Sequence, residues 1–132
     1  TVPAALLPAR LPDSTFGRIE LAWLDVRSMF RIDQLPIHLG RVGDAQFVVN
    51  DPRVSRLHAR IEERQGSCVL IDVSTYGTWV RFADNAAVIA LRRQECVLLL
   101  EGEIALGAPF EDFTVPTVSF KFADGKMHLQ KK

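Results

Sequence analysis

The chain has 132 residues with 48% hydrophobic content, which fits one domain whose core forms without disulfides or metals. Lys+Arg and Asp+Glu are both 16, and this zero formal charge argues against a nucleic-acid binder and against a membrane-surface anchor. Cys68 and Cys96 lie among apolar residues without paired zinc-ligand spacing, so we expect reduced core side chains and a cytoplasmic location, with no secretory signal and no membrane span.

Residues 1–15 contain three prolines without a sustained period, which predicts a linker or extended arm before a domain over 16–132. Short apolar or alternating segments follow, with turn signals about every 8–12 residues, as in an all-β sandwich. The Ala-rich stretch 85–91 has no helix cap and no 3.6-residue period, so we expect strand or loop there. About ten strands are predicted, over 19–23, 47–49, 57–62, 68–73, 78–82, 88–91, 96–100, 103–106, 118–122 and 127–129.

Turns are predicted where glycine, proline and small polar residues interrupt these segments. The predicted turns are Asn50-Asp51-Pro52, Gln65-Gly66, Glu101-Gly102 and Asp124-Gly125.

Three predicted loops carry side chains that can bind one oxyanion. Arg41 follows Gly40 at the end of an apolar run, and a guanidinium donates two forked N–H bonds to phosphate oxygens. Ser55 follows the turn 51–54, and Thr75 lies between two strands; each hydroxyl can donate one further bond. The sequence therefore predicts a phosphate-binding surface built from loops on a β-scaffold.

Other residues of these loops have structural interpretations. A single histidine such as His58 is more often a structural residue with both ring nitrogens bonded locally than a catalyst. Asp72 is expected to hold its loop, because a carboxylate repels an anion. Arg56 can reach a ligand or its backbone.

An enzyme with Ser55 as nucleophile and His58 as base is disfavoured. Three-residue spacing on a strand places the two side chains on opposite faces, and no glycine-flanked nucleophile elbow surrounds Ser55.

The order Gly40-Arg41, then Ser55-Arg56-Leu57-His58, then Asp72-Val73-Ser74-Thr75-Tyr76-Gly77-Thr78 resembles the forkhead-associated (FHA) domain. The later segment 101–107 is similar to a Gly-Asp-x-Ile-x-Leu-Gly strand pair of that family, and the resemblance covers roughly residues 16–123. It implies an eleven-stranded β-sandwich, not an enzyme, that binds phosphothreonine peptides in its apical loops and needs no cofactor or metal.

Position by position, the resemblance implies that Arg41, Ser55 and Thr75 bind the phosphate and that Arg56 contacts peptide or phosphate. The supporting residues of the site would be Gly40, His58, Gly77 and Thr78. The implied partner is a phosphothreonine-containing protein or a segment of the parent chain.

Two positions depart from the family pattern. Tyr76 stands where the family usually has an Asn that bonds the peptide backbone, and Arg81 in Val80-Arg81-Phe82 adds a cation that we expect near the site. Phosphate binding with altered peptide selection is one outcome of the Tyr76 change. The alternative is a phosphate-independent interaction or oligomerisation module, to which exposed apolar residues such as Trp79 would contribute.

A weaker resemblance concerns the parent protein. Residues 74–82, with 91–95 further on, are similar to FHA domains attached to bacterial class III adenylate/guanylate cyclases. The expectation is a domain of a larger signalling protein, whose partner, kinase and peptide preference one sequence does not identify.

Overall fold

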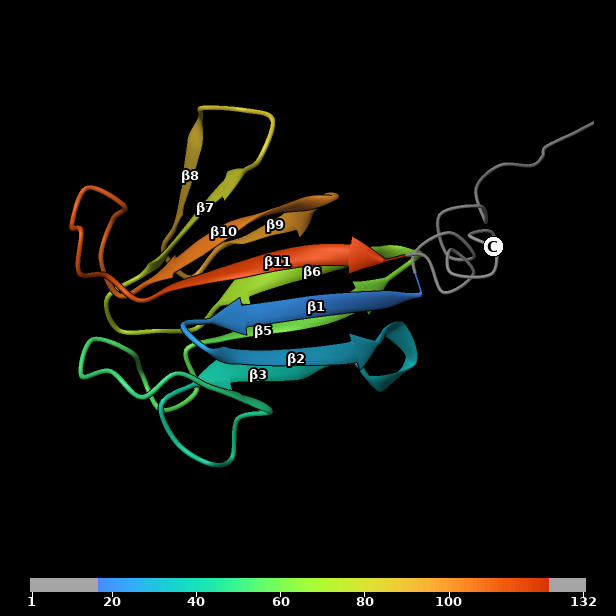
Figure 1. The fold of residues 1–132 in the computed structure, drawn as a ribbon, viewed down its shortest axis with the longest axis horizontal. Coiled ribbons are helices and arrows are strands. Elements are labelled where there is room, and N and C mark those ends of the chain that lie inside the picture. Colours follow the sequence, from blue (N-terminus) through green and yellow to red (C-terminus); the bar gives the residue numbers. More distant parts are fainter. Residues whose placement is uncertain (1–16, 124–132) are drawn as a thin grey trace, which may run out of the picture.

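The computed structural model describes residues 17–123, which form two β-sheets packed face to face (Figure 1). In this part of the chain the elements are β1 (Arg18–Trp23), β2 (Val26–Arg31), the 3-10 helix η1 (Ile32–Gln34), β3 (Ile37–Gly40), β4 (Phe47–Val48), β5 (Ala59–Arg64), β6 (Ser67–Asp72), β7 (Thr78–Phe82), β8 (Val88–Leu91), β9 (Glu95–Leu98), β10 (Glu101–Leu106) and β11 (Thr117–Ala123). The all-β sandwich of about eleven strands is thereby confirmed.

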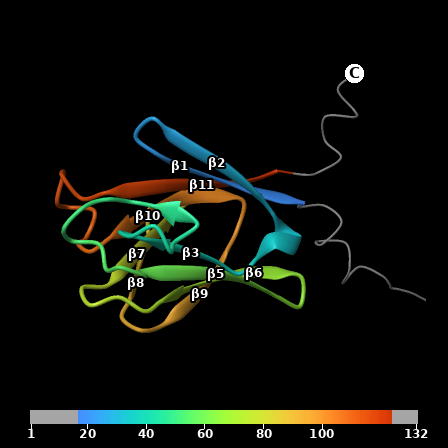
Figure 2. The same cartoon turned by 90° about the horizontal axis from the view of Figure 1, so that it is seen from below.

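One sheet has the strand order β2-β1-β11-β10-β7-β8, and the other has the order β4-β3-β5-β6-β9. The pairs are antiparallel except for β3 and β4, which run parallel. The turned view separates the two layers, with β1, β2 and β11 on one side and β5, β6 and β9 on the other (Figure 2).

The core lies between the sheets and follows from the alternation of apolar residues along the strands. Ile19 and Leu21 of β1 and Ile104 of β10 point inward from the first sheet, and Ile61 and Leu70 do so from the second; all five are fully buried. Since each strand contributes every second residue to one apolar layer, a shift of register by one residue would expose the core set.

Several predicted elements have the predicted bounds. Strands β7 and β8 cover 78–82 and 88–91 as expected, and the stretch 85–91 contains no helix. The turn Gln65-Gly66 joins β5 to β6 with positive φ at both residues, as a two-residue type I′ hairpin turn requires.

Two predictions of local structure were wrong, β2 was missed, and β3 was predicted only as an apolar run that ends at Gly40. β2 was not predicted, because this edge strand has Ser28 on its half-buried face and Met29 on its exposed face, so apolar and polar residues do not alternate in its sequence.

The predicted strand over 57–62 begins only at Ala59: Leu57 is exposed and His58 is fully buried, the reverse of the predicted alternation. The physical reason is that the His58 side chain bonds Ser55 and Gly77, which belong to two different loops.

The predicted turn Glu101-Gly102 is also wrong, because both residues belong to β10 and the chain turns at Leu99–Leu100 instead. Gly102 is needed for close packing of β10 against its neighbours and not for a turn. A Cβ at this position would lie 2.9 Å from the ring of Phe120 and would overlap the carbonyl oxygen of Arg81. The sequence pattern does not distinguish a glycine needed for close approach from one needed for a turn.

The loops that follow β3, β4, β6 and β10 gather at the left end of the sandwich in Figure 1, opposite the end where β1 begins and β11 ends. The loop after β8 joins them through contacts described below. We call the segments 41–46, 49–58, 73–77, 92–94 and 107–116 the apical loops. The predicted arm 1–15 and the predicted hairpin after residue 123 lie outside the described residues. Among the described residues, no helix has the length and apolar character to span a membrane.

Candidate functional site

Arg41, Ser55 and Thr75 are brought together by hydrogen bonds between their loops. The backbone N–H of Arg41 donates to the carbonyl oxygens of Ser55 and Arg56, at 3.0 and 3.1 Å. The backbone N–H of Thr75 donates to Oγ of Ser55 at 3.0 Å. Ser55 is therefore the link between the loop after β3 and the loop after β6, and the predicted convergence of the three residues is present.

The guanidinium of Arg41 is held on one side only. Its Nε donates to the carbonyl oxygen of Val54 at 2.8 Å, and no described residue accepts a hydrogen bond from its two terminal nitrogens. Arg41 is exposed and Ser55 is half-buried. Because Oγ of Ser55 accepts a bond from Thr75, its own O–H remains available as a donor. The arrangement offers a positively charged fork beside two hydroxyls.

Gly40 is required for this arrangement by close packing. A Cβ on Gly40 would overlap the carbonyl oxygen of Arg56, which is one of the two acceptors of the Arg41 N–H. Any side chain here would push apart the two loops that carry Arg41 and Ser55, so Gly40 has the predicted supporting position.

His58 joins two apical loops from inside the protein. Its side chain is fully buried; Nδ1 accepts the backbone N–H of Ser55 at 3.0 Å, and Nε2 donates to the carbonyl oxygen of Gly77 at 2.9 Å. That carbonyl also accepts the N–H of Gly107 at 3.0 Å. The prediction that both ring nitrogens bond locally is confirmed.

The prediction that Ser55 and His58 lie on opposite faces of a strand is wrong. The two residues lie in a turn rather than on one strand, and it is the backbone N–H of Ser55 that reaches the imidazole. Both imidazole nitrogens are engaged, so His58 has no free nitrogen to act as a base toward the Ser55 hydroxyl.

Below about pH 6.5 we expect the free energy of unfolding to fall. Burial lowers the pKa of His58, although bonding to Gly77 and the charge of Asp72 oppose this. The unfolded chain, with a histidine pKa near 6.5, therefore binds more protons than the folded state, and protonation of Nδ1 would set it against the Ser55 N–H. Full stability is present above this pH, and the loss approaches about 1.4 kcal/mol per pH unit below it.

Urea denaturation at pH 7.5, 6.5 and 5.5 measures this effect. His58→Asn serves as the comparison, because the amide can accept the Ser55 N–H but does not titrate in this range. The same pH dependence in both proteins would show that another group is responsible.

Asp72 holds the loop that carries Thr75, as predicted. It is 1% exposed, and its Oδ1 accepts the hydroxyls of Ser74 and Thr78 at 2.6 Å each. Oδ2 accepts the backbone N–H of Arg93 at 2.8 Å. Ser74 in turn accepts the N–H of Gly77 at 2.8 Å, so one buried carboxylate fixes both ends of the 73–77 loop and ties it to the loop after β8.

Ser74 and Arg93 were not predicted to have these roles. The spacing of Ser74 two residues after Asp72 is the signature of an Asx-type turn and could have identified the Ser74 contact. No sequence signal places Arg93 beside Ser74, because the two belong to loops 19 residues apart.

Arg56 and Tyr76 are exposed on these loops, and Tyr76 is 57% exposed. Thr78 and Gly77 are buried below them. The structure therefore places Arg56 and Tyr76 where a ligand could touch them, and Gly77 and Thr78 where they support the loop.

Arg53 was missed by the sequence analysis and differs from Arg41 in its contacts. Its guanidinium pairs with Asp51 at 3.0 Å and Asp112 at 3.1 Å, and it also donates to Thr114. The bond from Arg53 lowers the pKa of Asp51. Arg53 thus connects the 49–58 loop with the 107–116 loop, and its charge is compensated.

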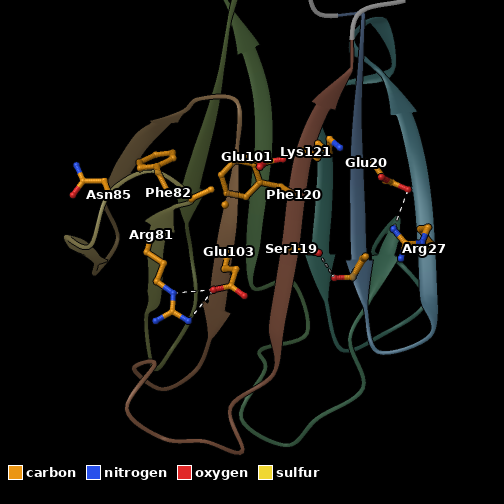
Figure 3. A pocket seen from close by; sticks show the side chains of 13 residues that line it. Glu20, Arg27, Arg81, Phe82, Asn85, Glu101, Glu103, Ser119, Phe120 and Lys121 are labelled. Atoms are coloured by element: carbon orange, nitrogen blue, oxygen red, sulfur yellow. Dashed lines mark hydrogen bonds and ion pairs between the residues drawn. The ribbon is translucent and has the colours of Figure 1, made fainter. Parts of the chain in front are cut away.

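Among the described residues, Arg81, which was expected to add a cation near the site, contacts an apical loop only through Phe110, and its charge is paired. It pairs with Glu103 at 2.8 Å and its guanidinium lies over the ring of Phe110, 4.1 Å from the centroid. It lines a hollow of about 560 Å³ on the outer face of the six-stranded sheet (Figure 3). None of the residues lining this hollow belongs to an apical loop.

The charges in that hollow compensate one another. Arg81 faces Glu103, Arg27 bonds Glu20 at 3.3 Å, and Lys121 lies in register with Glu101. The uncompensated guanidinium of Arg41 makes the apical loops, rather than this hollow, the candidate site for an anion. Among the described residues, no group of three or more His, Cys, Asp or Glu side chains could hold a metal ion.

Three solved structures illustrate the likeness to known proteins. The FhaA FHA domain in complex with the intracellular domain of Rv3910 is 28% identical, with a TM-score of 0.56 over 78% of this chain and 99% of that one. An FHA domain studied for phosphothreonine-dependent interactions is also 28% identical, with a TM-score of 0.58 and coverage of 79% and 95%. The N-terminal FHA domain of Rad53p from S. cerevisiae, in complex with a phosphothreonine peptide, is 18% identical, with a TM-score of 0.63 and coverage of 85% and 98%.

No curated protein matches the chain. The family model described as "FHA domain" matches residues 37–102, which span half of the 132 residues and include Arg41, Ser55 and Thr75. This chain therefore belongs to the FHA domain family.

Proposed function

We propose that this domain binds phosphothreonine peptides through Arg41, Ser55 and Thr75, and that it acts as a phosphorylation-dependent interaction module rather than an enzyme. The observation that carries the proposal is the position of the Arg41 guanidinium. Its Nε is fixed to Val54, and its two terminal nitrogens have no acceptor among the described residues, beside the hydroxyl that links the Ser55 and Thr75 loops.

The chemistry of a phosphorylated threonine matches this arrangement. A phosphate adds about −1.5 to −2 charges and three strong acceptor oxygens. Two parallel N–H bonds from Arg41 and one O–H bond each from Ser55 and Thr75 would use those oxygens, and guanidinium forks favour such planar pairing over a lysine point charge.

Peptide residues on either side of the phosphothreonine would contact Arg56 and Tyr76, which are both exposed on the same loops. Tyr76 replaces the Asn that the family uses for the peptide backbone. A phenol can donate and accept, but it is longer and rigid, so we expect altered peptide selection with phosphate binding retained.

The relatives support the proposal. Phosphothreonine-dependent interactions were studied for one 28% identical FHA domain, and the less similar Rad53p domain was solved with a phosphothreonine peptide. By the same reasoning, the partner proposed here is a phosphothreonine-containing protein or a segment of the parent chain. A cytoplasmic location and attachment to a class III cyclase remain predictions from the sequence.

An oriented phosphothreonine peptide library tests the proposal, together with matched libraries that carry threonine or phosphoserine. Isothermal titration with the selected peptides should give binding to phosphothreonine, at least tenfold weaker binding to threonine, and binding to phosphoserine weaker by about fourfold, the value of one buried methyl group. Equal binding of the threonine and phosphothreonine peptides would contradict it. Selection by a Tyr76→Asn variant shows which flanking preferences Tyr76 determines.

A second candidate function is a phosphate-independent interaction or oligomerisation module. It is favoured by exposed apolar side chains on the edge strands β8 and β9, namely Val88, Ile89 and Val97, together with Tyr76. Light scattering before and after phosphatase treatment distinguishes the two functions: a dimer that is indifferent to phosphatase, combined with no preference for phosphothreonine, would favour the second.

A further inference from the structure

Arg93 lies in the loop after β8 and is tied to the Thr75 loop by two hydrogen bonds. Its backbone N–H donates to Oδ2 of Asp72 at 2.8 Å, and its side-chain Nε donates to the carbonyl oxygen of Ser74 at 3.0 Å. The residue has a φ of 62°, in the left-handed region that non-glycine residues rarely occupy. The loop therefore holds an arginine at the apical end in a backbone conformation that glycine would adopt more readily.

The peptide group between Ser74 and Thr75 fixes where Arg93 lies relative to the phosphate-binding residues. In a trans peptide the C=O and the N–H point in opposite directions. The C=O of Ser74 faces Arg93, and the N–H of Thr75 faces Oγ of Ser55. Arg93 and Ser55 thus flank the same peptide group from opposite sides. The two hydrogen bonds of 3.0 Å each, together with the width of the peptide group between them, limit the distance from Arg93 Nε to the Ser55 hydroxyl to about 8 Å.

Arg93 and Arg41 are held in the same way. Each guanidinium donates through Nε to a backbone carbonyl, of Ser74 and of Val54 respectively, and no described residue accepts a bond from the terminal nitrogens of either. Other arginines with fixed side chains, such as Arg53 and Arg81, are paired with carboxylates. The terminal donors of Arg93 are exposed and uncompensated at the rim of the site.

The one carboxylate bonded to Arg93 does not occupy its side chain. Asp72 is buried and accepts the backbone N–H of Arg93, while its other oxygen is occupied by Ser74 and Thr78. The guanidinium of Arg93 remains available for an anion that comes from outside the chain.

We propose that Arg93 binds a second anionic group of the phosphopeptide, which makes it the residue that selects an acidic flank. The proposal rests on the proposed function of Arg41, Ser55 and Thr75. A separation of at most about 8 Å corresponds to no more than two or three residues of extended peptide, which rises about 3.3 Å per residue. The second anion is therefore the carboxylate of an Asp or Glu, or a second phosphate, a few residues from the phosphothreonine.

The experiment uses phosphothreonine peptides that carry alanines on both sides, with one Asp placed in turn at each of the three positions before and after the phosphothreonine. For the wild-type protein, isothermal titration should show three- to tenfold tighter binding when the Asp occupies one of these positions. In Arg93→Gln the preference should fall below twofold, because the terminal donors are lost. Affinity for the all-alanine phosphopeptide reports separately on the lost bond from Arg93 Nε to the Ser74 carbonyl.

Arg92→Gln is the matched control, because it removes a charge from the adjacent residue, whose guanidinium lies over the Trp79 ring at 5.8 Å from the centroid. It should retain the acidic preference. Peptides with phosphoserine in place of the Asp show whether the second anion is better bound as a phosphate.

Three results would overturn the inference: no acidic preference in the wild type, a preference that persists in Arg93→Gln, or an equal loss of affinity for all phosphopeptides, which would mean that Arg93 only holds the loop. Failure of the proposed function is a different result, because the wild type would then bind the all-alanine threonine and phosphothreonine peptides equally.

Discussion

Arg41→Ala is expected to weaken the binding of a phosphothreonine peptide by at least tenfold and by up to a few hundredfold. A hydrogen bond to a charged group contributes about 1.5–3 kcal/mol, and each 1.4 kcal/mol is a factor of ten in affinity. The two terminal nitrogens of Arg41 are the donors that would be lost, and no described residue uses them in the unbound protein. The loss of affinity is therefore attributed to the ligand rather than to a broken internal ion pair.

Arg41→Lys separates the charge of the side chain from its geometry. Lysine keeps the positive charge but lacks the fork, so we expect affinity between those of the wild type and Arg41→Ala. Arg27→Ala is the control, since it removes an exposed arginine that bonds Glu20 on the outer face of the six-stranded sheet. Affinity is measured by isothermal titration and folding by thermal melting. Equal affinities for the wild type and Arg41→Ala, with both folded, would rule out phosphate binding at this site.

The sequence predicts those strands that have one apolar face and one polar face. In β1, β7 and β11 apolar residues alternate with polar ones, and the predicted segments overlap the observed strands. The edge strand β2 could not be predicted because its inner face is only half-buried and carries Ser28 beside Phe30, while Met29 is exposed on the other face. Apolar and polar residues therefore do not alternate in the sequence.

The convergence of Arg41, Ser55 and Thr75 was predictable in outline and not in detail. Their loops could be located between strands, but the bonds from Arg41 to Ser55 and from Thr75 to Ser55 depend on which strands are neighbours. The three loops follow β3, β4 and β6, and the sequence does not show that these strands belong to one sheet. The ligand-binding roles of these residues stay predictions, whereas their proximity is a property of the structure.

The contacts between distant loops could not be predicted from the sequence. Arg53 bonds Asp112 across 59 residues, and Arg93 bonds Asp72 across 21. His58 illustrates the same limit from inside the protein: local bonding of both ring nitrogens was predicted, but the two partners, Ser55 and Gly77, and the full burial of the side chain were not. A buried polar side chain is stable where both its donor and acceptor are satisfied, and only the folded arrangement shows that they are.

At Asp72, replacing a single carboxylate oxygen by an NH₂ group is expected to affect both the stability of the fold and the geometry of the site. Its Oδ1 accepts two hydroxyls and its Oδ2 accepts the Arg93 N–H, all within a buried loop junction. In Asp72→Asn the shape is unchanged, but whichever oxygen becomes an NH₂ group turns from acceptor to donor. In either orientation of the amide, at least one N–H or O–H donor then faces another donor and loses its acceptor.

We expect Asp72→Asn to lower the free energy of unfolding by about 2–3 kcal/mol, since an unsatisfied buried polar group costs about 1–3 kcal/mol and the lost bonds are to a charged acceptor. Urea denaturation measures this, and Asp84→Asn, at an exposed residue of the loop between β7 and β8, is the control that should leave stability within about 0.5 kcal/mol of wild type. Because Asp72 holds the loops of Thr75 and Arg93 in place, phosphopeptide affinity should fall even at temperatures where the variant is folded. If Asp72→Asn were as stable as the wild type and bound as tightly, the carboxylate would not be what orders the apical loops.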